Sequence, residues 1–227
     1  MALIATSIVA ADWAKFGEAL EVIRAAGASM VHVDVMDGHF VPDISVGLPV
    51  VASLRKSTEL PIEVHLLIER PERFVGEFLK AGADRVCVHF EATRHLPRLL
   101  DFIRAKKAKA GVALMYPTTL QAASGILGEI DFLTILCGEP KVGDRRADFI
   151  PRSVEKIRAA VQLRSERRLS FAIEAEGGLG GEHLEKVAAA GADILVAGPD
   201  IFNSGDPRGQ LTGLVHASQG SRGASVA

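Results

Sequence analysis

Eight short apolar runs, rich in β-branched residues, alternate along the chain with longer amphipathic segments. The runs are typical of buried β-strands and cover residues 3–8, 30–35, 62–67, 85–89, 110–114, 132–136, 170–174 and 194–197. The segments between them have apolar residues one helical turn apart, as Phe16, Leu20 and Ile23 are in residues 12–26. Asp12 is placed to cap that helix. The chain is therefore predicted to consist of repeated strand–helix units.

The same joint recurs where three of the predicted helices meet the next strand. An Ala-Gly-Ala sequence stands at residues 26–28, 81–83 and 190–192. A glycine just past a helix adopts the left-handed conformation at no steric cost, so the chain can turn directly into the following strand. Eight such units in 227 residues predict a (β/α)8 TIM barrel of the α/β class, and a doubly wound open sheet is the alternative.

Length and composition favour one large domain. The chain is 48% hydrophobic and 24% charged, and we assign residues 1–218 to a single barrel domain. Leu211, Leu214 and Val215 indicate a short closing helix, and the small polar residues 219–227 predict a disordered C-terminal tail. Cys87 and Cys137 lie in separate apolar runs, which predicts two buried, reduced thiols.

The charge and the apolar runs exclude two classes of partner. A net charge of −2 gives no electrostatic reason to expect binding to nucleic acid or to an anionic membrane. No apolar run is long enough to span a bilayer, and the start of the chain lacks the features of a signal peptide. We therefore expect a cytoplasmic protein that acts on a small molecule. We also expect a homo-oligomer, whose size the sequence leaves open.

Polar side chains gather where the predicted strands end. In a (β/α)8 barrel the C-terminal ends of the strands carry the active site. The polar residues at or just after those ends are Ser7, His32, Asp34, His65, His89, Glu174 and Glu176. His32 and Asp34 share one face of their strand because Val31, Val33 and Val35 alternate with them. A solvent-facing strand surface is the alternative for this pair.

Imidazoles and carboxylates from the second, third and seventh predicted strands could converge near the barrel axis. Mixed nitrogen and oxygen ligation suits zinc, iron(II), manganese or cobalt better than calcium or magnesium. Such an ion would polarise a substrate carbonyl and acidify the adjacent C–H group. Carboxylates on opposite faces of a planar enediolate would then invert a stereocentre. Glu174 is predicted to orient a ligand. His89 is predicted to be a hydrogen-bonded histidine of the core, and a side chain that faces the site is the alternative.

Several motifs together resemble the ribulose-phosphate 3-epimerase family. They cover much of the chain and comprise residues 32–42 (HVDVMDGHFVP), 65–67 (HLL), 81–84 (AGAD), 89–96 (HFEATRHL) and 190–198 (AGADILVAG). The His-x-Asp-x-Met-Asp-Gly string is the most specific of them. The resemblance implies a TIM barrel of the ribulose-phosphate-binding type with one divalent metal ion. It also implies interconversion of ribulose 5-phosphate and xylulose 5-phosphate by proton exchange at carbon 3.

The resemblance also assigns roles to individual residues. His32, Asp34 and His65 fall on the family's metal ligands, and Asp34 is in addition one of its two acid/base carboxylates. Ser7 falls on a serine that contacts substrate and Met36 on a methionine that lines the site, and His65 is expected to contact substrate as well.

The second acid/base residue departs from the family pattern. The family has an aspartate in an Asp-Gly-Gly motif, which is also its fourth metal ligand, whereas this chain has Glu176-Gly177-Gly178. The extra methylene moves the carboxylate by up to about 1.5 Å. A displacement of about 1 Å can cost on the order of a hundredfold in rate. Either the strand has shifted to absorb the change or turnover suffers.

The loops that hold the substrate's phosphate in the family depart further. The substrate-binding residues expected there are Gly143, Gly177, Gly178, Gly198 and Pro199. After the sixth strand only Pro140 and Gly143 match the family, and after the eighth Pro199 removes an N–H donor. Asp200 then adds a negative charge, which either repels a phosphate or caps a helix in its place. Lys141, Arg145 and Arg146 either replace the lost donors or form a solvated charged loop.

Three hypotheses follow. The first is a metal-dependent epimerase of a ketose phosphate in which Asp34 and Glu176 exchange the proton and His32, Asp34, His65 and Glu176 hold the metal. The second keeps this chemistry for a different or non-phosphorylated sugar. The third is a barrel that has lost turnover and serves as a binding protein.

Overall fold

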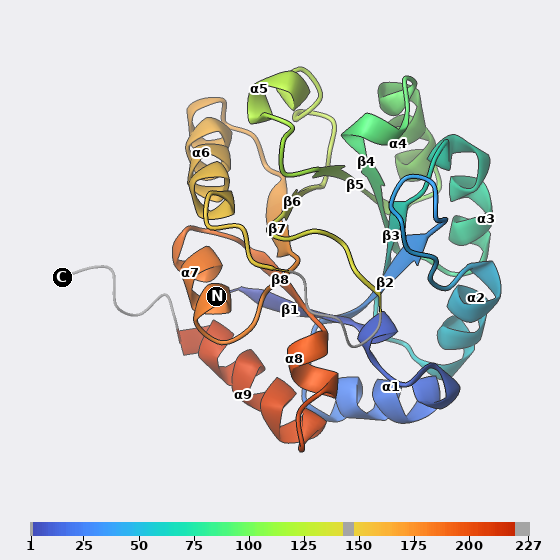
Figure 1. The fold of residues 1–227 in the computed structure, drawn as a ribbon. Helices are drawn as coiled ribbons and strands as arrows, with labels where there is room; N and C mark the ends of the chain where they lie inside the picture. The colour runs from blue at the N-terminus through green and yellow to red at the C-terminus, as the bar shows by residue number, and fades with distance from the viewer. Residues whose placement is uncertain (1, 143–147, 221–227) are drawn as a thin grey trace.

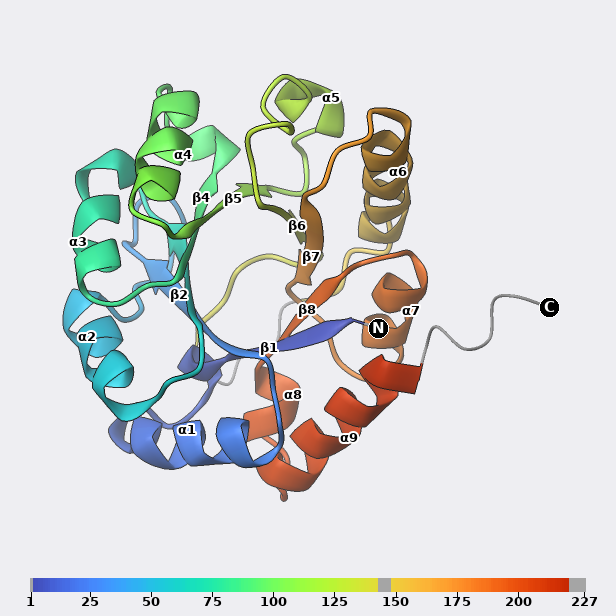
Figure 2. The same ribbon diagram turned by 180° about the vertical axis from the view of Figure 1, so that it is seen from behind.

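The computed structural model describes residues 2–142 and 148–220, with eight parallel strands closed into a barrel inside a ring of helices (Figure 1; Figure 2). The strands pair in chain order, and β1 pairs with β8 to close the barrel. They are β1 (Leu3–Ser7), β2 (Met30–Met36), β3 (Ile62–Leu67), β4 (Arg85–His89), β5 (Lys109–Leu114), β6 (Phe132–Leu136), β7 (Ala172–Glu176) and β8 (Ile194–Ala197). Closure confirms the predicted TIM barrel and excludes the open sheet.

The helices follow the strands in the order that the sequence predicts. The α-helices are α1 (Phe16–Ala25), α2 (Leu48–Ser57), α3 (Val75–Lys80), α4 (Leu96–Ala105), α5 (Leu120–Ala123), α6 (Ser153–Glu166), α7 (Glu182–Ala189), α8 (Pro199–Phe202) and α9 (Pro207–Gly220). Short 3-10 helices are η1 (Ile8–Ala10), η2 (Trp13–Lys15), η3 (Pro71–Arg73) and η4 (Phe90–Ala92). The predicted closing helix is α9, which continues to Gly220. Residues 221–227 of the predicted tail lie outside the described part of the chain.

Local signals in the sequence explain the joints between these elements. The Asp12 carboxylate accepts a hydrogen bond from the backbone N–H of Ala14 (3.0 Å), as predicted for a cap, but it caps η2 ahead of α1. Gly27, Gly82 and Gly191 have φ angles of 75°, 108° and 104°. These left-handed conformations are those expected where a helix turns directly into a strand.

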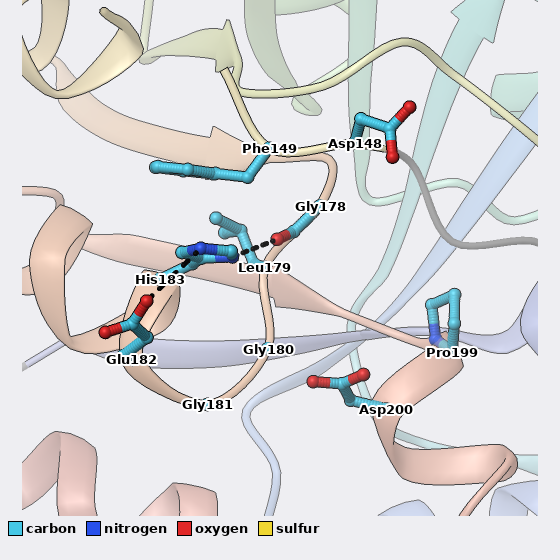
Figure 3. Close-up of a pocket in the computed structure, with 10 residues that line it drawn as sticks. All are labelled: Asp148, Phe149, Gly178, Leu179, Gly180, Gly181, Glu182, His183, Pro199 and Asp200. Atoms are coloured by element: carbon cyan, nitrogen blue, oxygen red, sulfur yellow. Dashed lines mark hydrogen bonds and ion pairs between the residues drawn. The ribbon is translucent and has the colours of Figure 1, made fainter. Parts of the chain in front are cut away.

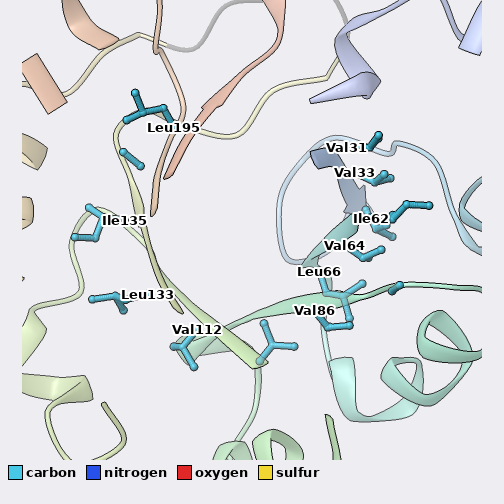
Figure 4. Close-up of a cluster of buried hydrophobic side chains, with 14 of the residues drawn as sticks. Val31, Val33, Ile62, Val64, Leu66, Val86, Val112, Leu133, Ile135 and Leu195 are labelled. Carbon is cyan, nitrogen blue, oxygen red and sulfur yellow. The ribbon is translucent and has the colours of Figure 1, made fainter. Parts of the chain in front are cut away.

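Alternation along the strands separates an apolar outer layer from the side chains that point into the barrel. Val31 and Val33 of β2 pack with Ile62, Val64 and Leu66 of β3 in the core between barrel and helices (Figure 4). Because successive side chains of a strand point to opposite faces, the residues between them point into the barrel. Imidazoles and carboxylates can therefore point toward the barrel axis while the alternate residues of the same strands keep the outer core apolar.

An apolar and aromatic plug fills the barrel interior near β4, β5 and β6. Phe132 is fully buried, and the guanidinium of Arg85 lies 4.0 Å from the centre of its ring. Gly111 leaves room for the ring, because a Cβ atom there would lie 2.2 Å from it. Cys87 contacts the same cluster, and Cys87 and Cys137 are buried free thiols, as predicted.

The seventh strand begins and ends two residues later than predicted. Its pairing with β6 runs from Phe132↔Ala172 to Leu136↔Glu176, and the N–H of Cys137 donates to the carbonyl of Glu176 at 2.6 Å. Glu174 and Glu176 therefore lie within the strand, on the same face of it. The prediction was wrong because it ended the strand at the first charged residue, although a barrel interior accepts charges that have partners.

Within residues 2–142 and 148–220, no helix is both long and apolar enough to cross a membrane.

Candidate metal centre

Four buried side chains from three strands meet inside the C-terminal end of the barrel. His32 and Asp34 come from β2, His65 from β3 and Glu176 from β7, and each offers one ligand atom within 4.8 Å of the others. The Nδ1 atom of His65 lies 2.9 Å from Oε2 of Glu176 and 3.3 Å from Oδ1 of Asp34. The Nε2 atom of His32 lies 3.0 Å from Oδ1 of Asp34 and 3.6 Å from Oε2 of Glu176. The two imidazoles and two carboxylates thus face one common point.

Strand register explains this convergence. Asp34 is paired with His65 across β2 and β3, so the two side chains leave the sheet at the same height. His32 lies two residues before Asp34 on the same face. Glu176 is the last residue of β7, which β1 and β8 separate from β2 in the closed barrel. Its extra methylene lets the carboxylate reach His65 across the interior.

The buried atoms of this cluster fit a divalent cation. Nδ1 of His65 and Oε2 of Glu176 are 2.9 Å apart, yet in the described part of the chain neither atom has a hydrogen-bond partner. Buried polar atoms without a partner are costly, and a cation between them would satisfy both. Two imidazole nitrogens and two carboxylate oxygens form a donor set suited to zinc, iron(II), manganese or cobalt.

The pKa shifts reflect how closely these charges are packed. Burial opposes protonation of His65, but the carboxylates of Glu176 and Asp34 outweigh it and raise its pKa to about 10. The pKa of His32 is raised well above its usual value because Asp34 and Glu176 likewise outweigh the effect of burial. Burial and the charge of Asp34 raise the pKa of Glu176. Excess negative charge at the cluster attracts positive charge, either as protons or as a metal ion.

A network of buried ion pairs supports His32 on the side of its ring that faces away from Asp34. Its Nδ1 atom lies 3.0 Å from Oε1 of Glu63, and Glu63 forms a buried ion pair with Arg85. Arg85 also lies 3.9 Å from Glu174, which accepts a hydrogen bond from Thr134 at 2.8 Å. Glu174 also lies within 4.8 Å of ligand atoms of both His32 and Glu63, so it borders His32 directly as well as through Arg85. Sequence reasoning missed Glu63 and Arg85, whose place opposite His32 follows from pairing between β2, β3 and β4.

His89, predicted to be a hydrogen-bonded core residue, is fully buried next to His65. The two Nε2 atoms are 2.9 Å apart, and the rings stack with centroids 5.0 Å apart. Burial lowers the pKa of His89 to about 4, so its ring is neutral at pH 7.

The remaining predicted site residues surround a narrow opening above the cluster. Ser7 donates a hydrogen bond from Oγ to Oδ2 of Asp34 at 2.8 Å. A cavity of about 70 Å³ is lined by residues that include Ser7, Asp34, Met36, Lys141, Glu176, Gly177, Gly178, Gly198 and Pro199. Gly143, Arg145 and Arg146 lie outside the described residues. The structure thus brings the other predicted residues to one mouth of the barrel.

A larger hollow of about 460 Å³ adjoins this opening and shares Gly178 and Pro199 with it (Figure 3). Its wall carries the carboxylates of Asp148, Glu182 and Asp200. Asp200 lies directly against the loop after β7, because a Cβ atom at Gly180 would be only 1.3 Å from its Oδ2 atom.

His183 of α7 lines this hollow. Its ring stacks on Phe149 with centroids 4.2 Å apart, and its Nδ1 atom lies 3.3 Å from the carbonyl oxygen of Gly178 (Figure 3). Sequence reasoning missed both aromatic residues because they follow different strands and meet only in the folded barrel.

The chain is similar to known proteins over most of its length. A sequence model described as the ribulose-phosphate 3 epimerase family matches residues 3–202. The chain is 38% identical over 214 residues to ribulose-phosphate 3-epimerase of Aquifex aeolicus, covering 94% of this chain and 96% of that one. The enzyme of the same name from Bacillus subtilis is 37% identical, with coverage of 91% and 94%. Orotidine 5'-phosphate decarboxylase of Pyrococcus horikoshii shares the fold, with a TM-score of 0.66 at 18% identity, covering 96% of this chain and 100% of that one.

Proposed function

The chain belongs to the ribulose-phosphate 3-epimerase family, and from that premise we propose that it interconverts ribulose 5-phosphate and xylulose 5-phosphate. The observation that carries the proposal is the buried cluster of His32, Asp34, His65 and Glu176. It supplies two carboxylates for proton exchange at one carbon, and two imidazoles that together with them would hold one divalent ion.

Asp34 and Glu176 would act as the acid/base pair. One carboxylate removes the proton from carbon 3, the C–H electron pair enters the new C2–C3 double bond, and the carbonyl oxygen gains the negative charge. The other group, in its acid form, donates a proton to the opposite face of carbon 3. Carbon 3 is then inverted, and the two residues have exchanged protonation states.

A zinc, iron, manganese or cobalt ion bound by His32, Asp34, His65 and Glu176 would polarise the carbonyl and stabilise the charge that develops on its oxygen. The surrounding residues keep the bases in place. Ser7 holds Oδ2 of Asp34 by a hydrogen bond of 2.8 Å, which fixes the orientation of this carboxylate. Burial of all four groups excludes bulk water from the proton path.

Removal of metal gives a direct test of this function. We expect the purified protein to convert ribulose 5-phosphate to xylulose 5-phosphate in D2O, with deuterium entering at carbon 3, as followed by NMR. Dialysis against a chelator should lower the rate at least about a hundredfold, because an ion stabilises the developing charge by several kcal/mol. Adding back one equivalent of divalent metal should restore it. A chain that stays inactive with every candidate metal would instead support a binding role.

A second candidate substrate is a ketose without a phosphate. The observation that favours it is the Asp200 carboxylate, which lies against Gly180 on the wall of the larger hollow. Two charges about 4 Å apart near a protein surface interact by about 4 kcal/mol, so a carboxylate there would oppose a phosphate.

Replacing Asp200 separates the two substrates. If the carboxylate opposes the phosphate, Asp200→Ser should lower KM for ribulose 5-phosphate by about tenfold or more and leave kcat/KM for ribulose unchanged. Glu182→Gln, on the same wall but in α7, is the matched charge control. The non-phosphorylated ketose would be excluded as the substrate if the unaltered protein strongly preferred ribulose 5-phosphate and Asp200→Ser left KM for that sugar unchanged.

We also propose, from the sequence, that the protein works in the cytoplasm as a homo-oligomer. The bacterial relatives support the first part of this proposal. Light scattering of the purified chain would measure its oligomeric state.

A further inference from the structure

A line of hydrogen-bonding groups leads away from His65 on the side opposite the carboxylate cluster. Nε2 of His65 lies 2.9 Å from Nε2 of His89, and Nδ1 of His89 lies 3.3 Å from Oε2 of Glu91. The other oxygen of Glu91, Oε1, accepts a hydrogen bond from the backbone N–H of Met115 at 3.0 Å. This chain of contacts therefore runs from His65 in β3 to His89 in β4 and then to Glu91. The backbone N–H of Met115, just after β5, anchors Glu91.

These contacts allow only one arrangement of protons when Glu91 is ionised and both imidazoles are neutral. A carboxylate only accepts hydrogen bonds, so Nδ1 of His89 carries the hydrogen and donates it to Glu91. A neutral His89 then has a lone pair on Nε2 and accepts a hydrogen bond. His65 must supply that hydrogen from its own Nε2, so a neutral His65, the form that binds a metal ion, has its lone pair on Nδ1. This lone pair faces Asp34 and Glu176.

We propose that His89 and Glu91 are positioning residues that fix His65 in the tautomer able to bind the metal ion. The inference rests on the proposed metal centre and adds two residues to it. The ring of His89 stacks on that of His65 at an interplanar angle of 17°, and the ring of Phe40 packs against His89 with centroids 4.8 Å apart. These contacts hold the two imidazoles in their relative orientation. His32 is held differently, since its Nδ1 atom contacts the Glu63 carboxylate directly.

Glu91→Gln is the sharpest test because it preserves shape and reverses the hydrogen bonds. The N–H of Met115 keeps the amide oxygen of Gln as its acceptor, so the amide NH2 group faces His89 and donates to Nδ1. His89 then carries its hydrogen on Nε2 and donates to Nε2 of His65. His65 is left with its hydrogen on Nδ1, where it would have to bind the metal.

We expect Glu91→Gln to weaken binding of Zn²⁺, measured by competition with a chromophoric chelator, by about tenfold to a hundredfold. Co²⁺ loaded in its place should show a changed visible spectrum, because one nitrogen ligand is lost or displaced. Glu72→Gln is the matched control, since this exposed glutamate lines the same outer cleft as Glu91 but is not among the groups that contact His89. Its metal affinity should equal that of the unaltered protein.

A second pair of variants distinguishes positioning from a merely structural role. His89→Leu removes the acceptor for His65, whereas the side-chain oxygen of His89→Gln can accept the same hydrogen bond. We expect weak metal binding in the first and near-normal binding in the second. The rise in Tm on adding metal should also shrink in His89→Leu, whereas a structural defect alone would lower Tm equally with and without metal.

Two results would overturn the inference, and they differ from each other. Unchanged Zn²⁺ affinity in both Glu91→Gln and His89→Leu would show that His65 needs no support from this side. Failure of the unaltered protein to bind Zn²⁺ or Co²⁺ at all would remove the metal centre itself, and the proposed function with it.

Discussion

Asp34→Asn should abolish both epimerisation and the entry of solvent deuterium at carbon 3. Asparagine keeps the shape of the side chain but cannot accept a proton, and acid/base groups contribute about 10²- to 10⁴-fold to rates. Asp34 is also a proposed metal ligand placed 3.0 Å from His32 and 3.3 Å from His65, so the loss should exceed about a thousandfold. NMR in D2O measures conversion and exchange together.

The controls for Asp34→Asn separate chemistry from folding and from metal loss. Asp101→Asn changes the same residue type on the surface of α4, where Asp101 pairs with Arg104, and should leave the rate unchanged. Metal content of Asp34→Asn should be determined on the same sample. Exchange at carbon 3 that continues at the normal rate would exclude Asp34 as a base.

Glu176→Gln should separate inversion from proton exchange. With one carboxylate left, Asp34 can still remove and return a proton on its own face of carbon 3, provided that metal is kept saturating. We expect inversion to fall by about 10²- to 10⁴-fold, the contribution of one acid/base group. Deuterium should nevertheless enter one of the two epimers and not the other, which NMR of each sugar in D2O would reveal.

Glu176→Asp gives the conservative comparison. It restores the residue type that the family has at this position but draws the carboxylate back by about 1.5 Å from where it now meets His65 at 2.9 Å. A displacement of about 1 Å can cost on the order of a hundredfold, so we expect a slower but still inverting protein. Equal and complete exchange into both epimers by Glu176→Gln would contradict the two-carboxylate mechanism.

The sequence was sufficient for the fold because its signals are local and repeated. Glycines after three helices, caps such as Asp12 and runs of β-branched residues each act over a few residues, so the eight strand–helix units could be placed in order. Alternation of valines with His32 and Asp34 also placed those two side chains on the inner face. The error at β7 has the opposite cause, because only pairing with β6 shows that the strand continues through Glu176.

The sequence by itself determined the barrel, its order of strands and the residue types at the barrel mouth. Only the tertiary structure decided which of those residues meet and at what distance. The buried ion pair of Glu63 with Arg85, the contact of His65 with His89 and the stacking of Phe149 on His183 join residues from different strands and loops. Such contacts depend on register and on barrel closure, which bring together groups that are far apart in the chain, and no local pattern encodes those distances.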